Sequence, residues 1–162
     1  MSPNTIAIIG IISNLIAVIF LIWGLADLEW SVFRKARKAL YIISFVIFCL
    51  TLILMILIIV FANLRSVPNF ITFNNIGKIL CLITIWLCAL AFIFLLIAEI
   101  LILVDYSDIE EAFGPGRNIP SHDRAAAILP GILGLISSVI VSLCANILYK
   151  MFNDNILTSF DI

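Results

Sequence analysis

The sequence predicts an all-α polytopic membrane protein: an antiparallel bundle of four transmembrane helices that forms a single membrane domain over residues 1–162. Composition is the first reason. The chain is 64% hydrophobic and only 12% charged, with a mean hydropathy of +1.28, whereas soluble domains carry about a quarter charged residues. A domain of this size still exposes roughly a third of its unfolded-chain surface. We therefore expect the surplus apolar surface to face lipid.

The second reason is the presence of four long apolar runs. A hydrocarbon core about 30 Å thick needs roughly 20 helical residues, and four segments satisfy this length. The first run lacks a preceding basic segment and a small-residue cleavage site, so we interpret it as a retained span rather than a secretory signal. The expected spans are 5–25, 40–62, 79–104 and 125–149, joined by short connections at 26–39, 63–78 and 105–124 and followed by a tail at 150–162.

A cluster of basic residues predicts the orientation. Cations of short loops are retained on the cytoplasmic side, and the connections 26–39 and 105–124 hold six Lys or Arg residues against three on the opposite side. We therefore expect these two connections to be cytoplasmic and both termini to be non-cytoplasmic. Trp23 and Tyr41 would join an aromatic belt at the cytoplasmic boundary. The cluster consists of Arg34, Lys35, Arg37 and Lys38.

The same four cations have a second interpretation, as a patch that holds anionic lipid headgroups. We favour the orientation signal, because four charges are the minimum for such a patch.

Each span carries a stripe of small or weakly polar residues, which is typical of helix contacts in lipid, where close packing replaces the hydrophobic effect. The fourth stripe is the densest, and its partner is either the first span or another protein. The stripes comprise Gly10, Asn14 and Ala17 in the first span; Ser44, Phe48, Thr51, Met55 and Ile58 in the second; Thr84, Cys88, Ala91, Leu95 and Glu99 in the third; and Gly131, Gly134, Ser138, Ser142 and Asn146 in the fourth.

Three polar residues inside the spans need a separate account. Asn14 and Asn146 are the only amides there, and we favour interhelical hydrogen bonds over a polar pathway for both. Glu99 is the only charge within the spans. A charge in that position indicates a cation or proton site or an ion pair with a partner subunit. Its place near the end of the third span also allows a purely structural interpretation, with the carboxylate reaching the headgroup layer.

Recognisable catalytic, cofactor and metal motifs are missing from the sequence. The single histidine, His122, stands in a connection, and the four cysteines have no metal-ligand spacing. A net charge of −1 provides no basic field for nucleic acid. We therefore expect a non-catalytic protein without a cofactor or metal, although bound lipids are expected.

These observations favour an accessory or scaffold subunit of a larger membrane complex. It would pack laterally against other integral membrane proteins, as a homo- or hetero-oligomer, through the fourth stripe and Glu99. The alternative is a small oligomeric channel or transporter in which Glu99 and Asn14 line a pathway shared between subunits.

Overall fold

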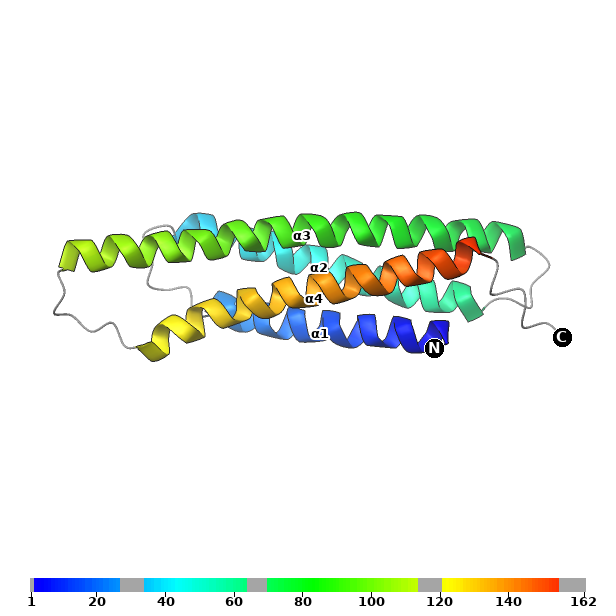
Figure 1. The fold of residues 1–162 in the computed structure, drawn as a ribbon, viewed down its shortest axis with the longest axis horizontal. Helices are drawn as coiled ribbons and strands as arrows, with labels where there is room; N and C mark the ends of the chain where they lie inside the picture. The colour runs from blue at the N-terminus through cyan, green and yellow to red at the C-terminus, as the bar shows by residue number, and fades with distance from the viewer. Residues whose placement is uncertain (1, 27–33, 64–69, 114–120, 155–162) are drawn as a thin grey trace.

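The computed structural model describes residues 2–26, 34–63, 70–113 and 121–154 and shows four helices. They are α1 (Pro3–Ala26), α2 (Arg34–Asn63), α3 (Phe70–Phe113) and α4 (Ser121–Asn153). The helices run side by side, each antiparallel to the one before it (Figure 1). Each contains a segment long and apolar enough to cross a membrane, so the expected all-α, multi-pass four-helix bundle is confirmed.

The helices extend beyond the expected spans. α3 has 44 residues, and it takes in much of the stretches 63–78 and 105–124 that we expected to be connections. The bounds of the spans stay a prediction, because hydropathy marks only where side chains must be apolar and does not mark where a helix ends. A helix satisfies its backbone hydrogen bonds internally and can continue past that region with polar side chains.

The four helices form a ring. α1 packs against α2 and α4, α3 packs against the same two neighbours, and the two diagonal pairs scarcely touch. The start of α1 and the end of α4 lie at one end of the bundle (Figure 1), which we call the terminal end. The opposite end, where α2 begins with residues 34–38, is called the basic end.

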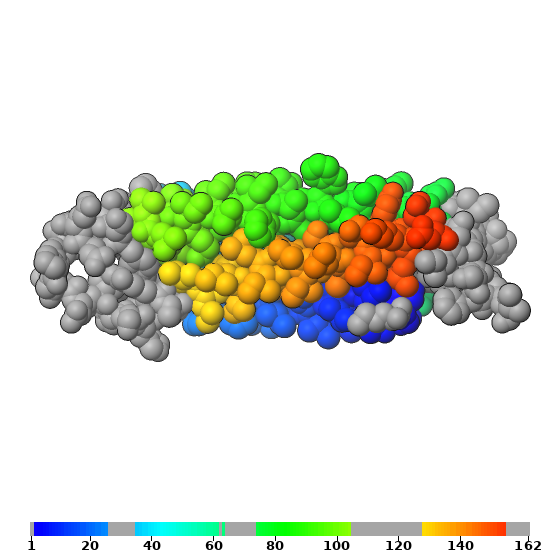
Figure 2. Space-filling model, in the orientation of Figure 1, coloured from blue at the N-terminus to red at the C-terminus, as the bar shows by residue number. Residues whose placement is uncertain are grey.

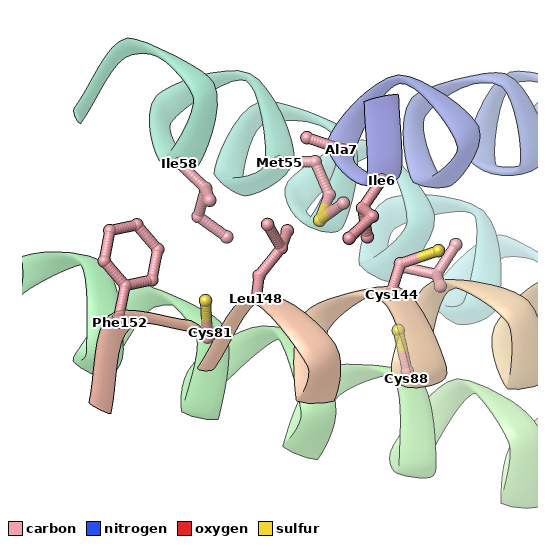
Figure 3. Packing of buried hydrophobic residues seen from close by; sticks show 10 residues of the cluster. Ile6, Ala7, Met55, Ile58, Cys81, Cys88, Cys144, Leu148 and Phe152 are labelled. Atoms are coloured by element: carbon pink, nitrogen blue, oxygen red, sulfur yellow. The ribbon is translucent and has the colours of Figure 1, made fainter. Parts of the chain in front are cut away.

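Apolar side chains from all four helices fill the interior. Near the terminal end, Met55 of α2 reaches towards Ile6 and Ala7 of α1, while Leu148 and Phe152 of α4 lie across from them (Figure 3). A second cluster at the basic end contains Leu21, Phe48 and Leu95. Isoleucine and leucine dominate the exposed faces, and the visible surface of α4 lies between those of α3 and α1 (Figure 2). These exposed faces are the surface that lipid would contact.

The stripes of the first three helices all lie in the interior, where every one of the residues named above from those stripes is buried. Glycine permits the closest approaches. A Cβ on Gly10 would collide with the methyl group of Met55, and one on Gly24 would lie 3.0 Å from Cβ of Pro130 in α4. At Gly10, α1 therefore approaches α2 closely, and at Gly24 it approaches α4 closely.

The stripe of α4 follows the interior only in part. Gly131, Gly134 and Ser138 are buried, but Ser142 is half-buried and Asn146 is exposed. The interhelical hydrogen bond predicted for Asn146 is therefore not made within the described part of this chain. Each step of four residues advances about 40° beyond a full turn, so two such steps from Ser138 carry Asn146 out of the interface. The interior is continued instead by Val141, Ala145 and Leu148.

Replacing Gly134 with Leu is expected to destabilise the isolated chain. A Cβ at this position would already lie 2.7 Å from Cδ1 of Leu95, and the remaining atoms of leucine have no space to occupy. Overpacking of this kind costs about 1–3 kcal/mol, occasionally more. The measurement is the unfolding midpoint in mild detergent, with Ile132→Leu as the control because Ile132 is 43% exposed on the same helix. Equal midpoints for the two variants would contradict this packing.

Candidate functional site

Glu99, the charged residue of the third span, faces the interior of its own bundle. It lies on α3 towards the basic end and is only 7% exposed. The hydroxyl of Tyr41 on α2 donates a hydrogen bond to Oε1 of Glu99 at 2.5 Å. An O–H to carboxylate hydrogen bond of this length is among the stronger kinds in proteins. Glu99 therefore joins α2 to α3 and is turned away from any neighbouring subunit.

Arg37 completes this arrangement from α2. It stands one turn before Tyr41, and residues four apart share a helix face. The Arg37 side chain is 5% exposed, and its positive charge acts on both Glu99 and Tyr41. We expected Arg37 at the headgroups and Tyr41 in an aromatic belt. The expected place of Tyr41 was wrong, because it is 1% exposed.

The other two helices close around the same carboxyl group. A Cβ on Gly131 of α4 would fall onto the Glu99 carboxylate and would come within 2.8 Å of Oη of Tyr41. On α1, a Cβ on Gly24 would lie 3.2 Å from Cε1 of Tyr41. Glycine at these positions leaves the space that the polar groups occupy. We call Arg37, Tyr41, Glu99 and Gly131 the carboxylate cluster.

A second polar contact lies deeper in the bundle. The hydroxyl of Thr51 is 3.1 Å from Oδ1 of Asn14 and 2.9 Å from the carbonyl oxygen of Phe48, so its single proton is shared between two acceptors. Asn14 is fully buried. Tyr41 and Thr51 are ten residues apart on α2, hence about 15 Å at 1.5 Å per residue. With Asn14 near the middle of the bilayer, the carboxylate cluster lies near the edge of the hydrocarbon core.

The remaining candidate residues are more scattered. Lys35 and Lys38 are exposed, and the side chain of Arg34 lies outside the described residues. Ala17 is buried in the apolar cluster at the basic end. Asn14 and Glu99 are both interior but belong to different layers.

The arrangement around Glu99 supports a structural role for this residue. The Tyr41 hydroxyl donates to one oxygen of Glu99 and the Arg37 charge acts on the same carboxyl group, in a space closed by a glycine backbone. The second carboxylate oxygen, Oε2, is buried and has no hydrogen-bond partner in the part of the chain that the structure describes. Among the described residues, no group of three or more His, Cys, Asp or Glu side chains could hold a metal ion. The side chain of His122 lies outside the described set.

Sequence reasoning missed the partners of Glu99. The stripe predicted for the second span begins at Ser44. Steps of three and four residues towards the N-terminus extend the same stripe to Tyr41 and then to Arg37. An aromatic and a basic side chain are typical of a membrane boundary. For this reason, the helix face that both residues share with Ser44 was not recognised. That spacing was the signal that could have found them.

Comparisons with models of protein families, with curated proteins and with solved structures found no match to this chain. The functional argument therefore depends on the chain itself.

Removing the Tyr41 hydroxyl should destabilise the bundle by about 0.6–2 kcal/mol, the range for interhelical hydrogen bonds in membranes. Tyr41→Phe should cost less in a Glu99→Gln background, because a neutral amide oxygen accepts a weaker hydrogen bond than a carboxylate. Unfolding free energies of the four proteins in the double-mutant cycle give this coupling. Tyr149→Phe is the matched control, since Tyr149 is half-buried and its hydroxyl has no hydrogen-bond partner among the described residues. Additive changes in the unfolding free energy would contradict the proposed coupling between Tyr41 and Glu99.

Adding one methyl group at Gly131 should be more harmful than adding one at Gly134. At Gly134 the obstructing atom is Cδ1 of Leu95, the end of a flexible side chain that can move. At Gly131 the obstruction is a carboxylate held by Tyr41. We expect Gly131→Ala to lower the unfolding free energy by about 1–3 kcal/mol, and Gly134→Ala to lower it by less. The reverse order would show that the carboxylate is not fixed where the structure places it.

Proposed function

We propose that this four-helix membrane protein is a non-catalytic accessory or scaffold subunit of a larger membrane complex. One observation carries the proposal: the four helices turn their polar and small residues inward and present a nearly continuous apolar belt. Exposed isoleucines, leucines and valines make up most of this belt. A bundle whose interior is occupied by its own side chains acts on its surroundings through this outer surface. In the plane of the membrane, the surroundings are lipids and other integral membrane proteins.

The surface used for these contacts differs from the one that the sequence suggested. Gly131, Gly134 and Ser138 lie against α1 and α3 of the same chain. Glu99 is hydrogen-bonded to Tyr41. None of them is free to bind a partner while the bundle is intact. Lateral binding, as a homo- or hetero-oligomer, is therefore assigned to the outward faces.

For the basic residues we retain the orientation signal as our interpretation. Lys35 and Lys38 are exposed at the basic end, where they can meet lipid headgroups, while Arg37 points inward. In this proposal the connections 26–39 and 105–124 are cytoplasmic and the termini are on the other side. Bound lipids are the expected small molecules, and the protein acts without a cofactor and without nucleic acid.

The alternative function, a small oligomeric channel or transporter, requires Glu99 and Asn14 on a pathway shared between subunits. Both side chains are buried within their own bundle. Bulky residues such as Phe48, Met55 and Leu95 fill the interior around them. This placement favours the scaffold proposal over that pathway.

The proposal predicts that the purified chain, reconstituted alone in liposomes, conducts ions no better than protein-free liposomes do. It also predicts that chains extracted from their native membrane in polymer nanodiscs carry another membrane protein, or further copies of the chain, at a constant ratio. Flux assays and mass measurement of the nanodiscs test the two expectations. Conduction that Glu99→Gln abolishes would overturn the proposal, and so would nanodiscs that contain one chain and lipid alone.

A further inference from the structure

One amide stands out on the otherwise apolar surface. Across residues 6–25, 40–61, 79–104 and 128–149 of the described chain, Asn146 is the only exposed residue with an amide, hydroxyl or charged side chain. Its side chain makes no hydrogen bond to any other described residue. The other amide of the spans, Asn14, is buried and contacts Thr51. Asn146 is therefore an exception to the inward placement of polar side chains in the rest of these segments.

The depth of Asn146 makes its exposure unfavourable in a lone chain. It lies 15 residues along α4 from Gly131, which packs on Glu99 near one edge of the hydrocarbon core. This corresponds to about 22 Å of helix, several ångströms short of the opposite edge of a core about 30 Å thick. Lys150, one turn further on, is the next exposed polar residue. An asparagine side chain is too short to span that distance, so its donors and acceptor would face lipid tails.

We propose that the outer face of α4 around Asn146 is the contact surface for a second copy of this chain. The proposal deepens the lateral function proposed above by naming the partner. Copies inserted in the same direction and related by a two-fold axis along the membrane normal bring each residue near the axis against its own equivalent at the same depth. A primary amide is both donor and acceptor. Two Asn146 side chains thus satisfy each other, which a single lysine or glutamate could not do.

The neighbouring residues suit this contact. Val139 and Leu143 are exposed on the same face as Asn146, and Ser142 is half-buried at its edge. Val139 lies seven residues before Asn146, two turns away on nearly the same line along the helix. The surface thus has one polar residue among branched apolar ones. A single polar residue in such a seam fixes register and partner choice.

The contact can be tested by disulfide cross-linking of the full chain in liposomes, at a protein-to-lipid ratio low enough to make chance encounters rare. Cys49 is replaced by Ala, and Cys81, Cys88 and Cys144 are left in place because they are buried. Val139→Cys then reports on the α4 face. Leu50→Cys is the matched control: both residues are 46% exposed, they lie at similar depth, and α2 stands diagonally across the ring from α4.

We expect Val139→Cys to form a disulfide-linked dimer and Leu50→Cys to form none above background. Adding Asn146→Leu should reduce the association constant on the order of 10-fold, the size expected for an interhelical amide contact. Asn146→Gln, which keeps the amide, should restore most of it. Because Asn146 is exposed, the unfolding midpoint of each variant, measured in detergent at a dilution at which the chain is monomeric, should stay at the wild-type value, which excludes misfolding as the cause.

Two outcomes would overturn the proposal: equal cross-linking of Val139→Cys with and without Asn146→Leu, or no cross-linking above the Leu50→Cys control. Cross-linking of Val139→Cys in native membranes solely to a different protein would also refute the second copy as the occupant. That last result would leave the lateral function proposed above intact, so the two failures are distinguishable.

Discussion

Lipid tails are as apolar as leucine, so burying leucine between helices gains little in a membrane. The structure depends on this constraint. Many bulky aliphatic residues remain on the outside, where lipid solvates them well, and the helix contacts add to their buried apolar residues the groups that lipid solvates poorly. Polar side chains and small residues that allow close approach therefore gather inside.

The helix pairs meet this constraint in two ways. α2 is tied to its neighbours by side-chain hydrogen bonds: Asn63 accepts from Asn4 at 3.2 Å, Thr51 meets Asn14, and Tyr41 donates to Glu99. α4 relies on close approach, with Gly131 and Gly134 against α3 and Pro130 against Gly24 of α1. The two means meet at the carboxylate cluster. There the absence of a side chain on α4 makes space for the hydrogen bond between α2 and α3.

The sequence was sufficient to predict the number of spans and the inward faces of α1, α2 and α3, because both follow from hydropathy and the helical repeat. It was insufficient for the ends of the helices, since a polar helical segment beyond the lipid has no hydropathic signature. Asn146 lies outside the interior for a geometric reason. Residues spaced four apart resemble a stripe in the sequence, but each step rotates further around the helix. Only the packing of α4 shows at which residue this rotation carries the side chain out of the interface. The partners of Glu99 are a tertiary property, since Arg37 and Tyr41 lie some sixty residues before it.

Arg37 shows how two explanations of one residue can both hold at different times. Loop cations influence orientation as each span enters the bilayer, before the helices associate. At that stage Arg37 counts with Arg34, Lys35 and Lys38, whatever its later neighbours. Once α2 and α3 pack, its side chain is buried and its charge acts on Glu99. The carboxylate in turn gives the buried guanidinium a counter-charge that lipid would not supply. In the proposed orientation, a charge that helps to orient the chain is thus used again inside the packed bundle, where it lies close enough to act on Glu99.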